Sequence, residues 1–186
     1  MLTAALLTSL IACFAAAFGG RWARLAASMP GGSAGHHLPA LGTALIAAAI
    51  AAFAGASLAA QFPPRPMLLL SAMALGFAAL PLFWPIRPID AAAKNAMAQP
   101  MRAAILLAAA MWGDGAPFLI LALAAWTHGF WLAAIGGFGG ILAAWGATRL
   151  LNDGFARWLY PARVILAALL LLAATFAAMR ALASPY

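Results

Sequence analysis

Residues 111–117 read Met-Trp-Gly-Asp-Gly-Ala-Pro and interrupt a long apolar run in which Asp114 is the only charge between residues 103 and 125. A charge in the hydrocarbon of a membrane costs about 3 kcal/mol even on a lenient scale, so it needs a structural or functional reason. The neighbouring glycines weaken a helix, and Pro117 cannot donate a hydrogen bond to the carbonyl of Gly113. The stretch therefore predicts a helix break that faces protein or a cavity instead of lipid.

The rest of the chain is as apolar as this stretch. Hydrophobic residues make up 67% of its 186 residues and charged residues 7%, against roughly 45–50% and 25% in a soluble domain. A soluble globule of this size buries only about 70% of its unfolded surface, so it could not hide so much apolar area. The composition excludes a soluble enzyme, a disordered tail and a nucleic-acid-binding domain, and it predicts an integral membrane protein.

Six apolar stretches reach the length of roughly 20 residues that one transmembrane helix requires. They are residues 2–26, 38–60, 66–86, 102–126, 128–148 and 161–179. We therefore expect an all-α membrane protein with six transmembrane helices. It divides into a first three-helix repeat over 1–89, a cytoplasmic linker over 90–100 and a second three-helix repeat over 101–186.

Basic residues predict the orientation in the bilayer. The loops after the first, third and fifth stretches hold Arg24, Arg87, Lys94, Arg102, Arg149, Arg157 and Arg163. The opposite side has only Arg65 and Arg180. Because cytoplasmic loops carry the excess of Lys and Arg, we expect a bacterial inner-membrane protein with both termini outside the cytoplasm.

The two halves share features at a nearly constant offset. Corresponding positions are Gly19 and Gly113, His37 and His128, Gly55 and Gly146, and Pro66 and Pro161. Three spans is an odd number, so the second half enters the membrane from the opposite side. Such inverted repeats are typical of secondary transporters, whose site lies where broken helices meet. Chance similarity between helices with small-residue faces is the alternative.

The segment Ala17-Phe18-Gly19-Gly20-Arg21-Trp22 corresponds to residues 111–116 across the repeat. With the six-span spacing, these segments resemble the six-span manganese/calcium transporters, the second calcium:proton antiporter family. Each repeat of that family carries a Glu-x-Gly-Asp-Lys/Arg-Ser/Thr motif. The resemblance implies a proton-coupled secondary transporter of Mn²⁺ or Ca²⁺, and no enzyme.

The chain departs from that motif at most of its charged positions. The glutamate positions are Ala17 and Met111, and Asp114 is the only one of four implied carboxylates. Mn²⁺ and Ca²⁺ require about six oxygen ligands, several of them anionic. A bound divalent cation at Asp114 would therefore occupy a degraded site. The alternatives are a non-transporting membrane scaffold or complex subunit, and a transporter of another solute in a cavity with Trp22, Trp112 and Arg21.

The expected transport site consists of Asp114, Gly113, Arg21, Gly19 and Gly20, with Asp114 as the candidate metal ligand and no catalytic residue. If the two segments approach each other, Arg21 and Asp114 are the natural intramembrane ion pair. If they do not pair, Asp114 could carry a proton. The residues leave both possibilities open.

Other polar and small residues give weaker indications. His36 and His37 resemble a solvated loop pair, and His128 an interfacial residue beside tryptophans. The glycines within 136–140 predict close helix packing, or flexibility in a moving repeat. The single Cys13 allows no intramolecular disulfide. Expected partners are the lipid bilayer and the transported ion, but no nucleic acid, and a homo- or hetero-oligomer is left open.

Overall fold

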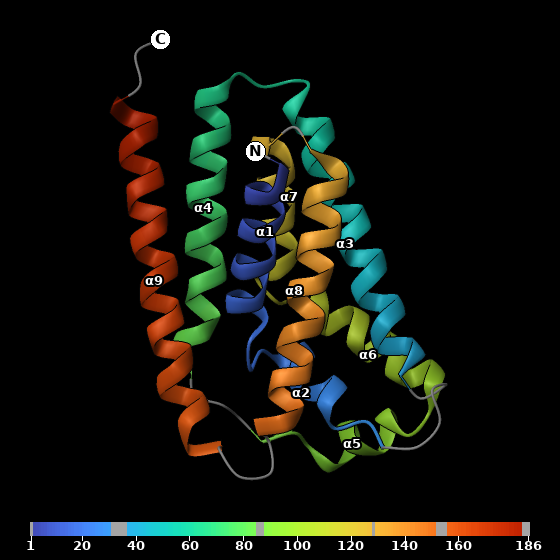
Figure 1. Cartoon of the computed structure of the whole chain (residues 1–186). Helices are drawn as coiled ribbons and strands as arrows, with labels where there is room; N and C mark the ends of the chain where they lie inside the picture. The colour runs from blue at the N-terminus through green and yellow to red at the C-terminus, as the bar shows by residue number, and fades with distance from the viewer. Residues whose placement is uncertain (1, 31–36, 85–87, 128, 152–155, 184–186) are drawn as a thin grey trace.

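The computed structural model describes residues 2–30, 37–84, 88–127, 129–151 and 156–183. Within these ranges the chain is helical and contains no strand, which confirms the expected all-α class. The helices are α1 (Leu2–Ala17), α2 (Arg21–Ala27), α3 (Leu38–Ala59), α4 (Pro64–Phe83), α5 (Ala91–Met97), α6 (Pro100–Trp112), α7 (Ala116–Thr127), α8 (Phe130–Leu151) and α9 (Ala156–Ala183) (Figure 1).

The described helices provide between four and six membrane spans. Four single helices, α3, α4, α8 and α9, are long and apolar enough to cross a bilayer. The pairs α1–α2 and α6–α7 also qualify together, but they are bent by 80° and 57° at their breaks. Each bent pair is therefore a broken span or a re-entrant segment. The chain is a membrane-embedded helical protein in either case.

Both breaks fall where the glycine-rich segments predict them. Gly19 has a φ of +61°, a left-handed conformation that favours glycine because a Cβ would clash there. The second break spans 113–115, which differs from a proline kink inside a continuous helix. Pro117 is the second residue of α7, where its missing N–H would have no helical partner in any case. Proline thus helps to start α7, and the residues before it end α6.

The helices form a bundle whose ends differ (Figure 1). The start of α1 and the end of α9 lie at one end. The ends of α2, α4 and α8 and the start of α9 lie at the other, which we name the loop end. Helix α5 also lies at the loop end, within the predicted linker. Its Met97 is only 1% exposed, so this segment packs against the bundle.

Small residues allow the helix backbones to approach closely. A Cβ built on Gly136 of α8 would lie 2.6 Å from the carbonyl oxygen of Leu6 in α1, and one on Gly140 would overlap the carbonyl oxygen of Leu10. Close packing of this kind is how helices associate in lipid, where burial of apolar surface provides no drive. The structure confirms the packing role predicted for the glycines within 136–140.

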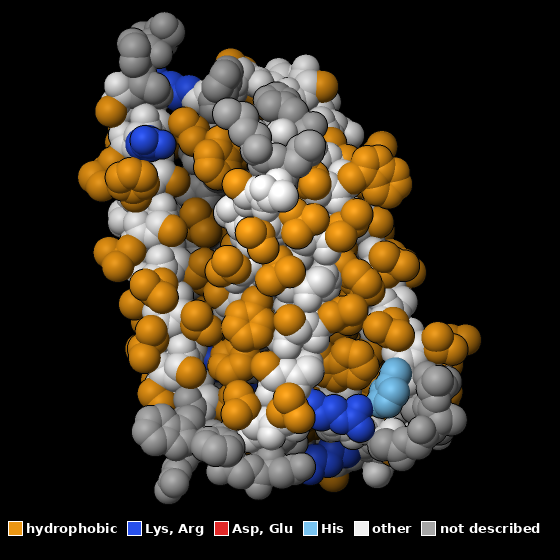
Figure 2. Space-filling model, in the orientation of Figure 1, with side chains coloured by type: hydrophobic (Ala, Val, Ile, Leu, Met, Phe, Trp, Pro, Cys, Tyr) orange, Lys and Arg blue, Asp and Glu red, His pale blue; other side chains and the backbone are white. Residues whose placement is uncertain are grey.

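The outer surface is a broad apolar band. In Figure 2, large hydrophobic side chains cover the visible face between its ends, while Lys and Arg gather near the ends. Phe53, Leu169 and Ile105 are examples that are more than half exposed. Trp126 and Trp131 are exposed at the end of α7 and the start of α8. Aromatic side chains at such positions suit the interface between hydrocarbon and lipid headgroups.

We expect Gly140→Ala to destabilise the bundle, because the new methyl group meets the α1 backbone. Overpacking of this kind typically costs about 1–3 kcal/mol. The matched control is Gly146→Ala on the same helix, where a Cβ would meet nothing within 4 Å. Thermal unfolding of the purified protein in detergent measures both. Equal melting temperatures for the two variants would contradict this account of the α1–α8 contact.

Candidate functional site

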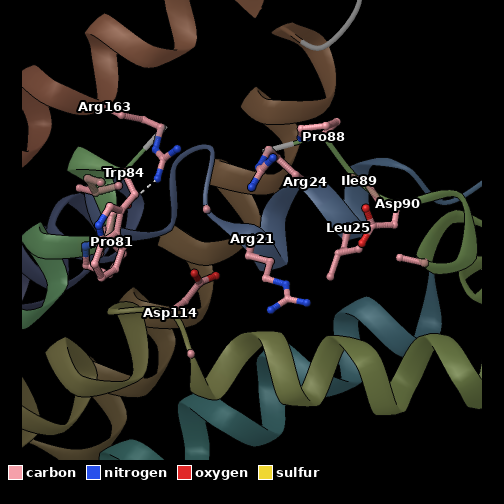
Figure 3. Close-up of a pocket in the computed structure, with 15 residues that line it drawn as sticks. Arg21, Arg24, Leu25, Pro81, Trp84, Pro88, Ile89, Asp90, Asp114 and Arg163 are labelled. Carbon is pink, nitrogen blue, oxygen red and sulfur yellow. Dashed lines mark hydrogen bonds between the residues drawn. The ribbon is translucent and has the colours of Figure 1, made fainter. Parts of the chain in front are cut away.

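A partly open cavity of about 690 Å³ lies toward the loop end, between the two helix breaks, the end of α4 and the residues before and within α5 (Figure 3). Its charged lining residues are Arg21, Arg24, Arg163, Asp90 and Asp114. Its walls therefore combine segments from both halves of the chain. We refer to this cavity as the arginine pocket.

Asp114 joins the two breaks directly. Its carboxylate is buried, with 6% of the residue exposed, and accepts a hydrogen bond of 3.1 Å from the backbone N–H of Trp22. The backbone of Arg21 also donates to it. These N–H groups belong to the first turn of α2, where helical partners are lacking and an anion is favoured. Asp114 of the second half therefore caps a helix of the first half.

Gly20 makes this approach possible. It is the residue before α2 and offers no side-chain cap of its own. A Cβ at Gly20 would lie 3.1 Å from both carboxylate oxygens of Asp114. Absence of a side chain therefore leaves room for the carboxylate beside the backbone.

Of the two possibilities open for Asp114, the ion pair with Arg21 does not form (Figure 3), and the structure describes both residues. Arg21 is exposed, and Figure 3 shows its guanidinium directed away from the carboxylate. The reason is local geometry: Arg21 is the first residue of α2, so its backbone N–H faces Asp114 while its side chain projects outward. Arg163 and Arg24 are the arginines whose charges act on Asp114 instead.

Arg163 is the residue that the sequence interpretation missed. It is 5% exposed, and its Nη2 donates a 2.8 Å hydrogen bond to the carbonyl oxygen of Pro81 in the last turn of α4. Its aliphatic part lies against Gly19, where a Cβ would be 3.0 Å from Arg163 Cδ. The orientation rule places Arg163 among the loop cations, although its position two residues after Pro161, inside an apolar stretch, is a signal for burial.

The remaining predicted site residues lie around the same two breaks. Gly113 lines the arginine pocket and is exposed. The backbone N–H of Gly19 donates to Oγ1 of Thr148, a fully buried residue of α8, at 3.2 Å. The two breaks are thus brought together as the repeat predicted, although with a different set of charge partners.

The predicted tryptophan lining is wrong. Trp22 is fully buried, and its indole Nε1 donates to Oγ1 of Thr43 at 3.3 Å. Trp112 is half exposed and does not line the arginine pocket. The tryptophan that lines this pocket is Trp84. Trp22 therefore belongs to the core, and the pocket is more polar than expected.

Of the three histidines, the structure describes His37 alone. His37 is half-buried at the start of α3; its Nε2 lies 3.5 Å from Nη1 of Arg149, and its ring packs edge-on against Trp145. This environment differs from the solvated loop expected for it. His36 and His128 lie outside the described residues.

Within the described part of the chain, no group of three or more His, Cys, Asp or Glu residues could hold a metal ion. Asp114, the candidate ligand, instead contacts backbone N–H groups. Comparison of the chain with models of known protein families, with curated proteins and with solved structures finds no match. The site's chemistry must therefore be argued from its own residues.

We expect Asp114→Asn to destabilise the protein by about 1.5–3 kcal/mol, because a neutral amide replaces the charged acceptor of the α2 N–H groups. One carboxylate oxygen becomes an NH₂ donor, so only the remaining amide oxygen can accept from the N–H groups of α2. Asp90→Asn is the control, since Asp90 lines the same pocket but is exposed. Chemical unfolding in detergent compares the two. Similar small losses for both variants would show that Asp114 is not the link between the breaks.

Proposed function

We propose that this chain is a secondary transporter that moves a small solute across the membrane by alternating access. The observation that carries the proposal is the contact between the two helix breaks beside a charged pocket. Broken helices that meet near the centre of a bundle are where such transporters bind their substrates. Here Asp114 on one break caps the helix that begins at the other.

The helix contacts support two inverted three-helix repeats. Exchange of the halves converts α1–α2 into α6–α7, α3 into α8 and α4 into α9. Under this exchange the packed pair α2–α8 becomes α7–α3, which is also packed. The pairs α3–α8 and α4–α9 map onto themselves, and both are in contact. An internal two-fold relation would produce these pairings, although the packed pair α4–α7 has no equally packed counterpart between α9 and α2.

The two ends of the bundle support alternating access. The arginine pocket lies toward the loop end, whereas α1 and α8 pack backbone to backbone above it at Gly136 and Gly140. A pocket that is open toward the loop end and closed toward the other end corresponds to one of the two states that alternating access requires. Because basic residues flank the loop end, we propose that it faces the cytoplasm of a bacterial cell and that both termini lie outside.

The resemblance to manganese/calcium transporters contributes the fold and the mode of action to this proposal. Assignment of Mn²⁺ or Ca²⁺ as the substrate rests on that resemblance alone. Three guanidinium groups line the pocket, and the buried carboxylate of Asp114 is engaged by α2. Such a charge distribution repels a divalent cation, so we favour a different solute.

A non-transporting scaffold or complex subunit is the second candidate. The capping role of Asp114 favours it, because a helix cap serves stability whether or not a solute moves. The two candidates differ in one property. A transporter exposes the base of its pocket to both sides of the membrane in turn, and a scaffold exposes it to one.

Cysteine labelling in oriented membrane vesicles tests the proposal. We expect Ala16→Cys, near the end of α1 where it lines the arginine pocket, to react with a membrane-impermeant maleimide from both sides. Ala93→Cys, on α5 at the loop end, reacts from that end alone. The wild type is the background control, since Cys13 is fully buried. Labelling of Ala16→Cys from the loop end only would contradict alternating access and favour the scaffold.

Titration with Mn²⁺ or Ca²⁺ tests the cation assignment separately. We expect neither ion to change the melting temperature of the purified protein, because a ligand stabilises a fold only if it binds the native state. A rise in melting temperature with Mn²⁺ that disappears in Asp114→Asn would overturn this expectation and restore the cation site.

A further inference from the structure

Positive charge exceeds negative charge in the arginine pocket. Its described lining contains three arginines and two aspartates. Asp90 is exposed, so solvent screens it. Asp114 is the one buried carboxylate among the described lining residues, and the charges of Arg24 and Arg163 act on it. Among the described lining residues, guanidinium groups therefore outnumber carboxylates, which favours an anion over a cation.

Arg163 has unused hydrogen-bonding capacity. Its Nη2 donates to Pro81, but its Nε is buried and has no hydrogen-bond partner among the described residues. A buried donor without an acceptor is unfavourable and is rare in folded proteins. Nε is enclosed by protein, so an acceptor on a molecule in the pocket that Arg163 lines would meet the Nη groups of its guanidinium.

The arginines also act on one another. Arg24 and Arg163 repel each other electrostatically, and Arg21 adds to the repulsion at Arg24. Figure 3 shows Arg24 and Arg163 on the same side of Asp114, with Arg21 at the pocket wall. An anion between these arginines would attract both guanidinium groups and so offset the repulsion between them. Guanidinium groups suit carboxylate and phosphate oxygens because their N–H groups form a planar fork.

The volume and walls of the pocket indicate the size of the anion. About 690 Å³ falls within the range of pockets that hold small organic molecules. Leu25, Leu82 and Trp84 provide apolar wall beside the arginines. A small organic molecule with one oxyanion and an apolar body matches both parts of the lining.

We propose that the arginine pocket binds an oxyanion, a carboxylate or a phosphate ester with an apolar body, through Arg163, Arg24 and Arg21. This inference rests on the proposed function and names the class of its solute. The same chemistry occurs in a free metabolite and in the headgroup of an anionic phospholipid. The experiment therefore includes both sources.

Binding of benzoate and phenyl phosphate to the full chain in an uncharged detergent tests the proposal. We expect saturable binding of at least one probe by equilibrium dialysis, together with a rise in melting temperature. Arg21→Gln is the main variant, because its exposed side chain makes no hydrogen bond within the described residues and its loss leaves the fold intact. It should weaken binding about fivefold, the factor expected of one partly exposed charge.

Arg163→Gln should abolish binding, and Arg163→Lys should restore part of it because the charge returns without the planar fork. Since Arg163 also contacts α4, its variants are compared only after their melting temperatures show a folded state. Arg180 lies over the Phe176 ring near the end of α9. Arg180→Gln is the control, because it removes the same single positive charge away from the pocket. It should bind like the wild type.

The lipid source is tested in nanodiscs of phosphatidylcholine with and without phosphatidylglycerol. Retention of phosphatidylglycerol that depends on Arg21 and Arg163, without binding of the soluble probes, would assign the oxyanion to a lipid headgroup. If neither source binds, or if Arg21→Gln and Arg180→Gln bind alike, the oxyanion site is wrong.

These results are separate from those for transport. Oxyanion binding with one-sided labelling of Ala16→Cys would keep the site and overturn the transporter. Two-sided labelling without binding of any probe would keep the transporter and overturn the oxyanion.

Discussion

The contact between the carboxylate of Asp114 and the first N–H groups of α2 determines how the two halves of this protein meet. A helix that starts inside a membrane protein exposes donors that no lipid can satisfy. The chain supplies their acceptor from a residue 92 positions away. The positions of α2, of the second break and of the space between them all depend on that contact. The arginine pocket lies beside the contact because neither broken helix continues into that space.

Much of the fold could be predicted from the sequence because lipid imposes a simple rule on composition. Apolar stretches long enough to cross a bilayer gave bounds for α3 that differ from the structure by one residue. The glycine segments around Gly19 and Asp114 gave the two breaks. Helix α5 was not predicted, because a seven-residue segment in a linker has no hydropathy signal.

Charge partners could not be predicted in the same way. The sequence places Arg21 opposite Asp114 by motif correspondence, but a helix's first residue presents its N–H to a cap and its side chain elsewhere. Arg163 is distant in sequence from both breaks, and only the packing of α9 against α4 brings it to Gly19. Spacing identifies which segments meet, whereas the direction of each side chain depends on tertiary packing.

The hydrogen bond from Arg163 to Pro81 has a consequence for how the pocket communicates with the rest of the bundle. The same guanidinium closes the last turn of α4, faces Asp114 and lines the pocket. A ligand that competed with Pro81 for Nη2 would weaken the contact through which α9 holds α4. By thermodynamic reciprocity, a shift of the α4–α9 pair must alter the affinity of the pocket to the same extent. Under the proposed binding, Arg163 would therefore couple occupancy of the pocket to helix position within a single side chain.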